Sequence, residues 1–480
     1  MLNQPVRAPA GARALSVGQQ AMWFLQQLAP ESTAYNAGSA VVLHFPVDAD
    51  ALTGAVRRLL ARHSLLGSVF RLVRGEVWRV AAQIDDAGLV DLRDVTGLDD
   101  DALRRLARDL AQVPFRLDRD LPVRISLLRR SGRDDVLVVT AHHIVVDDVA
   151  QVEILRGLLA EYAGRPAGET ESVPGDDAAD FDDYVRRQRE YLASPKAATA
   201  AAHWRGEFAG AEIPFDAGAD RPRPAVYQHT GAEVGFALPP KLAAGLRDAA
   251  AARNVTVFAY LISVFQVALY RHSGNTRFVV GYPVTQRTAH NRRSIGYFVN
   301  TLPLCAQIDP DDGLDAALKA ASRKMWRGLM HRDYPVAMMP RLLARPADPG
   351  RAGPIEVMFG LNTAGRGDEA SAGLLPGRLV EHAGLAVSRF DFPEQQGQFD
   401  ISVLVIQHDA GTHVKFKYNT SLFESRTAER LAAGYVELLE RAVAGTLPER
   451  LRDLRGRRAE AVAVSSTGPA GGAAGRLEPC

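Results

Sequence analysis

The chain has 480 residues, of which 47% are hydrophobic and 24% are charged, and its formal net charge is +1. These values are typical of a globular protein in water. A chain of this length is too long to fold around one ordinary hydrophobic core, so we expect two packed lobes. The balanced charge gives no bulk attraction to nucleic acid or to an anionic membrane, and we expect neither as a partner.

The N-terminal half begins with a segment that lacks a core pattern. Residues 1–14 are rich in Pro, Ala and Gly and are expected to be disordered. Residues 51–63 place apolar side chains at helical spacing with arginines on the other face, which predicts an amphipathic helix. Residues 136–141, VLVVTA, predict a buried strand. An acidic stretch with Pro and Gly at 169–180 is the predicted linker, so the first lobe spans residues 15–178.

The C-terminal half alternates helical and strand patterns in the same way. We expect a buried helix at 257–270, a strand at 277–282, a strand pair at 403–406 and 414–418, and a closing helix at 427–443. This lobe spans residues 179–458, and a small-residue tail at 459–480 is expected to be disordered. Helices mixed with strands in both halves predict an α/β (α+β) fold with a mixed sheet in each lobe.

The cysteines and the apolar segments bear on the cellular compartment. Cys305 and Cys480 share no metal-ligand spacing with the histidines, so we expect no disulfide framework and no metal site. The N-terminus has no apolar secretory-signal segment. The run 257–270 is shorter than the about 20 apolar residues of a membrane span. A cytoplasmic location is therefore predicted.

One short string stands out where the predicted strand 136–141 ends. It reads His142-His143-Ile-Val-Val-Asp147-Asp148. Because side chains alternate along a strand, one histidine can face a cleft while the other points into the protein. An unperturbed histidine, with a pKa of about 6.5, is substantially neutral near pH 7 and can take a proton from an amine that attacks a carbonyl. Asp147 could fix the following turn by pairing with an arginine.

Few competing chemical motifs occur in the chain. There is no GxxxxGK[ST] loop and no GxSxG elbow, and neither cysteine lies in a setting typical of a nucleophile. The structural alternative for the HHxxxD string is a buried histidine satisfied by backbone hydrogen bonds, followed by an acid that caps the next helix.

This string and several others resemble, in order, the core motifs of the condensation domains of nonribosomal peptide synthetases, within the chloramphenicol-acetyltransferase-like superfamily. The core signature of that family is HHxxxDG. The similar segments together cover about residues 14–455. They are Ser16–Leu25, Arg62–Phe70, His142–Asp148, Phe181–Tyr184 with Trp204, Asp220–Pro224, Ile295–Thr301, His331–Pro335 and Tyr418–Thr420.

The resemblance implies a V-shaped pseudo-dimer of two chloramphenicol-acetyltransferase-like lobes around a central tunnel. Carrier-protein arms would enter this tunnel from opposite faces. The resemblance assigns catalysis to His143, which is the second histidine of the motif. It assigns support of the motif to His142, which would point inward, and to an ion pair between Asp147 and Arg287.

The chain departs from the family pattern at Asp148, where the signature has glycine. Glycine lets a phosphopantetheine arm pass close to the backbone, whereas aspartate narrows the passage and adds charge. We assign Asp148, together with Asn300 of the fifth motif, to the acceptor side of the tunnel. Related non-catalytic recruitment domains also carry two aspartates here but generally lose the second histidine. The retained His143 therefore favours an active enzyme.

The resulting hypothesis is a free-standing acyltransferase of nonribosomal peptide or hybrid polyketide biosynthesis. It would transfer an acyl group from the phosphopantetheine thioester of a carrier protein to an amine or hydroxyl acceptor, forming an amide or an ester. The acceptor would be carrier-bound or a small molecule, and the chain itself would bind no cofactor. Three alternatives stay open: an acyltransferase for small free alcohols or amines, a silent module that recruits a partner enzyme, and a protein with merely structural histidines.

Overall fold

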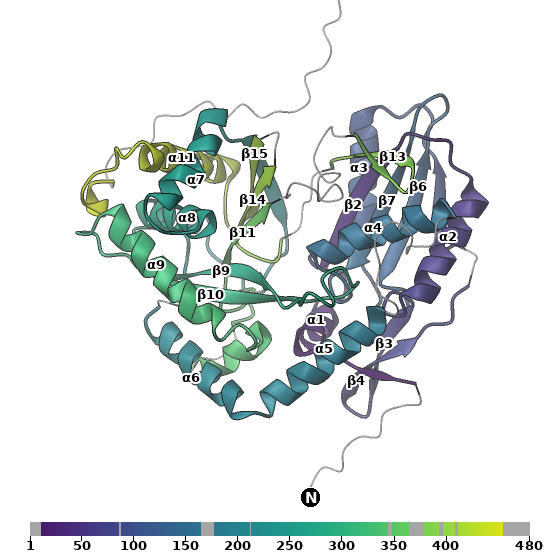
Figure 1. Ribbon diagram of the computed structural model, residues 1–480, viewed down its shortest axis with the longest axis horizontal. Helices are drawn as coiled ribbons and strands as arrows, with labels where there is room; N and C mark the ends of the chain where they lie inside the picture. Colours follow the sequence, from purple (N-terminus) through teal and green to yellow (C-terminus); the bar gives the residue numbers. More distant parts are fainter. Residues whose placement is uncertain are drawn as a thin grey trace, which may run out of the picture.

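The computed structural model places the chain in two lobes that lie side by side (Figure 1). It describes residues 11–85, 88–164, 177–211, 213–343, 348–363, 379–392, 397–408 and 411–454. The predicted tail at 459–480, the first ten residues and most of the predicted linker lie outside the described residues. Arg13 and Ala14 were expected to be disordered but form strand β1, because they pair with β4 (Glu76–Ala81) in antiparallel register.

The N-terminal lobe is built on a six-stranded sheet with the order β12-β13-β2-β7-β6-β5. The remaining elements of this half are α1 (Val17–Leu28), β2 (Asn36–Leu43), α2 (Ala49–Arg62), β3 (Ser68–Val73), β5 (Val90–Asp94), α3 (Asp100–Ala111), β6 (Val123–Arg129), β7 (Asp135–His142) and α4 (Asp148–Tyr162). Alternate residues of β7 point to opposite faces of the sheet. Leu137, Val139 and Ala141 therefore pack with α2 and α4, whereas Val136 and Val138 pack with α3.

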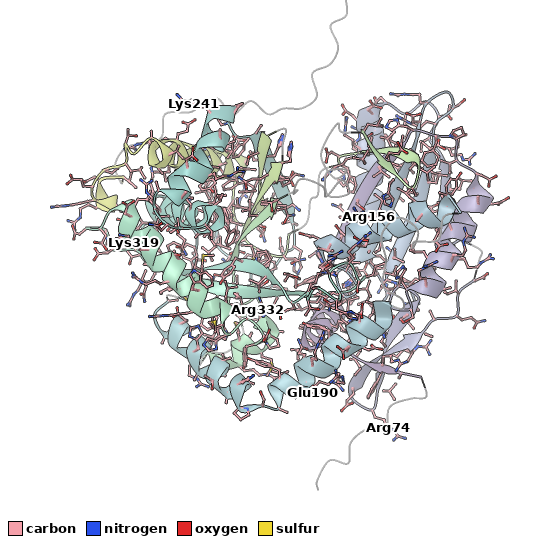
Figure 2. The ribbon with its side chains drawn as sticks, in the orientation of Figure 1. Arg74, Arg156, Glu190, Lys241, Lys319 and Arg332 are labelled. Carbon is pink, nitrogen blue, oxygen red and sulfur yellow. The ribbon has the colours of Figure 1, made fainter. Side chains whose placement is uncertain are left out.

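The C-terminal lobe is built on a second six-stranded sheet, β10-β9-β11-β14-β15-β8. Its strands are β8 (Gly231–Ala237), β9 (Arg277–Thr285), β10 (Val299–Gln307), β11 (Val357–Thr363), β14 (Ile401–His408) and β15 (Gly411–Asn419). Its helices are α6 (Pro195–Ala209), α7 (Pro240–Ala251), α8 (Val257–Ser273), α9 (Leu314–Leu329), η1 (Val336–Leu342), α11 (Ser425–Val443) and η2 (Leu451–Leu454). Helices α7, α8, α9 and α11 form one core with this sheet, and Figure 2 shows Lys319 on the outer side of α9.

The predicted secondary structure is confirmed for the patterned segments. The predicted helices correspond to α2, α8 and α11, and the predicted strands correspond to β7, β9, β14 and β15. Every residue of α8 from Ala259 to Tyr270 is buried, including Ser263 and Gln266. The Ser263 hydroxyl donates to the Ala259 carbonyl at 2.6 Å, which satisfies this polar group inside an otherwise apolar helix.

The chain does not divide between the lobes at residue 178 as predicted. Strands β12 (Leu379–His382) and β13 (Leu385–Arg389) come from the C-terminal half, yet β13 pairs with β2 at the edge of the N-terminal sheet. Phe181 of α5 (Asp177–Leu192), and Ile295 and Phe298 after β9, belong to the N-terminal core. Helix α5 and the segment after β9 run across the junction of the lobes, so they bury apolar side chains against the first lobe.

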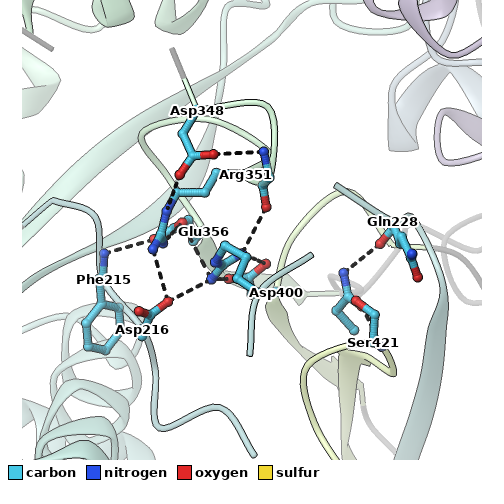
Figure 3. A network of polar contacts seen from close by, with 11 residues as sticks. Phe215, Asp216, Gln228, Asp348, Arg351, Glu356, Asp400 and Ser421 are labelled. Carbon is cyan, nitrogen blue, oxygen red and sulfur yellow. Dashed lines mark hydrogen bonds and ion pairs between the residues drawn. The ribbon is translucent and has the colours of Figure 1, made fainter. Parts of the chain in front are cut away.

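A charged cluster holds the loops at one end of the C-terminal sheet (Figure 3). Arg223 donates to Asp400 at 2.5 Å, and Arg351 donates to Glu356 at 2.5 Å. Asp216 bridges the two arginines at 3.0 and 3.2 Å. Burial raises the pKa of Asp400 and of Glu356, and the arginines oppose that rise. The cluster therefore fixes the chain just before β14, a strand that forms part of the junction between the lobes.

Candidate active site

His142 is the last residue of β7 and is completely buried. Its Nδ1 accepts a hydrogen bond from the Ile144 backbone N–H at 3.0 Å, so in the neutral ring the proton lies on Nε2, 3.3 Å from Gln26 Oε1. Burial lowers the pKa of His142 to about 3, with smaller contributions from His143 and Arg124. His142 is thus a neutral, inward-pointing side chain that ties the strand end to α1.

This burial predicts that the protein becomes less stable in mild acid. The folded-state pKa lies below the ordinary 6.5, so the unfolded chain binds the proton more tightly and stability falls as the pH drops from 6.5 towards 3. The contribution of one such histidine approaches about 1.4 kcal/mol per pH unit within that window. Denaturant melts of wild type and His142→Gln between pH 7 and 4 measure the difference in slope. Equal slopes would show that His142 is not the group responsible.

His143 lies in the turn that follows β7, where it is half-buried and lines a cavity between the lobes. Its backbone N–H donates to the Tyr35 carbonyl at 2.8 Å. Its ring Nδ1 lies 3.2 Å from the Val146 carbonyl oxygen, which can only accept, so Nδ1 carries a proton. In the neutral ring Nε2 then keeps its lone pair. One histidine points inward and the other lines a cavity, as the strand pattern predicted.

Asp147 caps the N-terminus of α4 and joins it to the other lobe. Its Oδ1 accepts from the Ala150 backbone N–H at 2.9 Å, and its Oδ2 accepts from the Phe298 backbone N–H at 3.1 Å. Arg287 donates to both oxygens, from Nη2 at 2.6 Å and from Nε at 3.3 Å. The Asp147 and Arg287 side chains are only 8% and 5% exposed. The predicted ion pair is therefore present and buried.

The remaining donors of Arg287 organise the segment that follows β9. Nη1 donates to the carbonyl of Asn291 at 3.0 Å and to that of Ser294 at 2.7 Å. The guanidinium carbon lies 4.5 Å from the centre of the Phe298 ring, a cation–π contact. Arg287 thus holds residues 287–298 in one conformation against the turn that carries His143.

Asp148 is the exposed first residue of α4, where a carboxylate also complements the helix dipole. Its Oδ2 accepts from Asn362 Nδ2 of β11 at 3.4 Å, a long hydrogen bond that crosses from one lobe to the other. Both side chains line the same cavity as His143. The sequence therefore placed Asp148 correctly beside the cavity, but it offered no signal for Asn362.

Asn300 does not lie where we expected it. The residue is 7% exposed and is absent from the cavity lining. Its Nδ2 donates to the carbonyls of Arg332 at 2.8 Å and Tyr334 at 2.9 Å, and its Oδ1 accepts from the Val336 N–H at 2.9 Å. These bonds fix the loop between α9 and η1. The prediction that Asn300 lies on the acceptor side of the tunnel is therefore wrong, because its side-chain amide forms hydrogen bonds to this loop instead.

The cavity between the lobes has a volume of about 1100 Å³. One wall consists of the start of β2, the end of α3 and the first two turns of α4. The opposite wall is the face of the β14–β15 pair that the helices leave uncovered, including Ser402, Leu404 and Lys415. Apolar surface with a few converging polar groups is typical of a substrate site.

A second inter-lobe cluster in this cavity was not predicted from the sequence. Glu153 of α4 is bound by Arg156 at 3.1 Å and by Arg293, from the segment after β9, at 3.2 Å. The adjacent Arg292 also lines the cavity. The one sequence signal for this cluster is the Arg-Arg pair just before the Ile295–Thr301 motif.

Neither a metal centre nor a membrane-spanning helix occurs in the part of the chain that the structure describes. These residues contain no group of three or more His, Cys, Asp or Glu side chains that could hold a metal ion. Within the same described ranges, no helix has the length and apolar character needed to cross a bilayer.

The two lobes, each with a mixed sheet packed against helices, define a chloramphenicol-acetyltransferase-like fold with an HHxxxD turn at the lobe junction. The sequence model of the condensation-domain family matches residues 10–452, and the chain belongs to this family. Among solved structures, it is similar to a four-domain nonribosomal peptide synthetase bound to AMP and glycine, with a TM-score of 0.85 and 21% identity. That alignment covers 94% of this chain and 34% of the other.

Other comparisons agree on the fold and the family. The X-domain from teicoplanin biosynthesis in complex with OxyB has a TM-score of 0.79 and 22% identity, over 95% of this chain and 97% of that one. Tyrocidine synthase 3 of Brevibacillus parabrevis is 30% identical over 91% of this chain and 6% of its own length. Phosphinothricin tripeptide synthetase PhsC of Streptomyces viridochromogenes is 31% identical over 90% of this chain and 39% of its own length. The chain thus spans a small part of these curated relatives.

Proposed function

We propose that this protein joins an acyl group, delivered as a carrier-bound phosphopantetheine thioester, to an amine or hydroxyl acceptor in the cavity between its lobes. The observation that carries the proposal is the position of the His143 side chain and the tautomer of its ring. This side chain lines the cavity, and its Nδ1 proton is engaged by the Val146 carbonyl, which leaves the Nε2 lone pair for an acceptor proton. The similarity to a tyrocidine synthase and to a tripeptide synthetase supports the same substrate class.

The reaction balances without a covalent enzyme intermediate. The acceptor nitrogen or oxygen attacks the thioester carbonyl, and a carbon–nitrogen or carbon–oxygen bond forms. The acceptor proton passes to His143 Nε2, or His143 stabilises the charged tetrahedral intermediate. The carbon–sulfur bond then breaks, and the pantetheine sulfur leaves and takes up a proton. Direct attack requires no serine or cysteine nucleophile on the enzyme.

The other motif residues have supporting roles in this proposal. His142 is neutral and holds the strand end, and the Asp147–Arg287 pair fixes the turn that carries His143. Orientation of a catalytic group by its surroundings is worth orders of magnitude in rate, because a displacement of about 1 Å can cost 10²-fold. The chain therefore orients the catalytic histidine and supplies one proton acceptor, while the carrier protein supplies the activated acyl group.

Reconstitution with carriers supplied as separate proteins tests this function. Holo carrier proteins loaded with a panel of acyl groups are mixed with the chain and with amine or hydroxyl acceptors, either free or carrier-bound. Mass spectrometry then detects amide or ester products. Product formation that depends on the chain supports the proposal, and its absence across the panel contradicts it.

A second candidate function is recruitment of a partner enzyme without catalysis. It is favoured by the double aspartate at 147 and 148 and by the similarity to the teicoplanin X-domain, whose solved complex contains OxyB. Binding of a loaded carrier without turnover, in the same reconstitution, would select this alternative. Acylation of small free alcohols or amines without an acceptor carrier is the third outcome that the panel resolves.

Replacing Asp148 is expected to change acceptor use and to leave use of the acyl donor unchanged. Hydrogen bonds to a charged group are worth roughly 1.5–3 kcal/mol, so Asp148→Gly should raise the KM for a free polar acceptor about tenfold or more. Asp148→Asn is the matched variant that removes the charge and keeps the size. A gain of carrier-bound acceptor activity in the glycine variant would identify Asp148 as a gate. Unchanged kinetics would show that the position is neutral.

A further inference from the structure

Three polar side chains on the N-terminal lobe form a hydrogen-bonded chain outside the cavity. His44 follows the last residue of β2, Asp134 precedes β7, and Ser388 lies in β13. His44 Nδ1 lies 2.6 Å from Asp134 Oδ2, and His44 Nε2 lies 2.8 Å from Ser388 Oγ. These three residues are not among those that line the cavity with His143. The cluster is therefore separate from the candidate active site.

The register of the N-terminal sheet explains why these side chains meet. Strands β13, β2 and β7 are neighbours in that sheet, and Figure 1 shows β13, in green, on this lobe. Ser388 pairs with Val42, two residues before His44, and alternate residues of a strand share a face. The His44 backbone N–H also donates to the Ala386 carbonyl at 3.0 Å, which holds the two strands together here. On the other side, the register of β2 with β7, continued by one residue, places His44 opposite Asp134.

The hydrogen bonds define the tautomer of the His44 ring. An ionised carboxylate can only accept, so His44 Nδ1 carries a proton and donates it to Asp134. In the neutral ring Nε2 then keeps its lone pair and accepts from the Ser388 hydroxyl. A serine hydroxyl bound to a basic ring nitrogen, with the ring oriented by a carboxylate, is the arrangement that activates a nucleophilic serine.

The surroundings hold the aspartate in place and leave the cluster open to water. Arg130 Nε donates to the Asp134 carbonyl at 2.7 Å, and the Arg130 backbone N–H donates to Asp135 Oδ1 at 3.1 Å. These bonds fix the turn before β7. The His44 and Asp134 side chains are 31% and 49% exposed, and Ser388 is half-buried. A small molecule can therefore approach the cluster from solution.

We propose that Ser388 and His44, positioned by Asp134, form a second catalytic site that hydrolyses small acyl esters and thioesters. The Ser388 Oγ attacks the acyl carbonyl carbon, a carbon–oxygen bond forms, and the hydroxyl proton passes to His44 Nε2. The alcohol or thiol leaves with this proton when its bond to the acyl carbon breaks. Water, deprotonated by His44, then attacks the acyl-serine, which releases a carboxylic acid and restores Ser388. Asp134 keeps the ring oriented and stabilises its protonated form.

Labelling of the full chain with a fluorophosphonate tests the nucleophile directly, because this reagent bonds to activated serines. Mass spectrometry of peptides should locate the adduct on Ser388 and not on Ser425, an exposed serine whose hydroxyl donates to Glu429. Ser388→Ala should abolish the labelling, and His44→Gln should slow it roughly 10²-fold or more. Asp134→Asn, which removes the orienting charge, should slow it as well. Ser425→Ala is the matched control and should be labelled like wild type.

Hydrolysis of p-nitrophenyl acetate and of acetyl-N-acetylcysteamine measures turnover at the same site. Wild type should hydrolyse both compounds at least about tenfold faster than Ser388→Ala. His143→Ala should remain labelled at Ser388, since His143 lies in the separate cavity. This result would distinguish the second site from the proposed condensation site.

The alternative role of the same hydrogen bonds is to hold β13 against β2 without any chemistry. In that case wild type carries no adduct on Ser388, hydrolysis is equal in wild type and Ser388→Ala, and only the thermal melt of the variant changes. Each of the first two results overturns the proposal, as does labelling of Ser388 at the wild-type rate in His44→Gln. If Ser388→Ala does not fold, the position of the adduct in wild type and the labelling rate of His44→Gln still decide.

Discussion

Replacement of His143 with alanine is expected to lower kcat by roughly 10²–10⁴, the usual value of general acid–base assistance. The fold should survive, because the His143 ring is half-buried and its hydrogen bond to the Val146 carbonyl is a local one, three residues along the chain. Initial rates with a loaded carrier, together with a thermal melt of the same sample, measure both quantities. His143→Gln, which keeps a polar side chain without a basic ring nitrogen, should be impaired to a similar degree.

Replacement of a second histidine provides a control, which distinguishes a loss of catalysis from a general effect of removing a histidine side chain. The His290 side chain is 78% exposed and lies 3.1 Å from Asp180, so His290→Ala should keep nearly full activity. Near-wild-type turnover in His143→Ala would reject the proton-transfer role. In that case the catalytic contribution of the cavity would come from positioning of the two substrates alone.

Replacement of Asp147 with alanine is expected to destabilise the protein by about 3–5 kcal/mol, in addition to reducing activity. The change leaves the Arg287 guanidinium buried without its counter-ion, uncaps α4 and removes the acceptor of the Phe298 N–H. Equilibrium denaturation with urea, followed by circular dichroism, measures the loss.

Asp315 supplies the matched control for this change. Its ion pair with Arg253 has a similar length of 2.8 Å, but the Asp315 side chain is 66% exposed. Asp315→Ala should therefore cost less than about 1 kcal/mol. If Asp147→Ala unfolds at the wild-type denaturant concentration and only turnover falls, Asp147 acts in the chemistry and not in the structure.

The features that the sequence predicted well are those with a strong local pattern. The helix at 257–270 and the strand at 136–141 were found because mainly apolar runs of those lengths have few other solutions. Strand alternation also separated the two histidines, since a one-residue step reverses the direction of a side chain. The pairing of Asp147 with Arg287 was predicted instead from the family resemblance, because no local sequence pattern links two residues that lie 140 positions apart.

The features that were missed depend on distant contacts. Asn300 lies within a motif that matches the family, but its role is set by the loop at 332–336, which the sequence does not place beside it. Asn362 contacts Asp148 only because the end of β11 and the start of α4 border the same cavity. The predicted lobe boundary was wrong for a similar reason, because no periodicity in residues 379–389 indicates which of the two sheets these residues join.

The pairing of β13 with β2 has a consequence for how the protein is made. Val41 and Leu43 of β2 take their sheet partners from Arg389 and Val387, which leave the ribosome long after the rest of the N-terminal sheet. Until then the β2 edge exposes unpaired N–H and C=O groups, a template for pairing with another chain. Although domains often fold in order during synthesis, this first lobe can complete its sheet only when most of the second has been translated. A fragment that ends at residue 178 should therefore be prone to aggregation, and we expect the two lobes to fold as one unit.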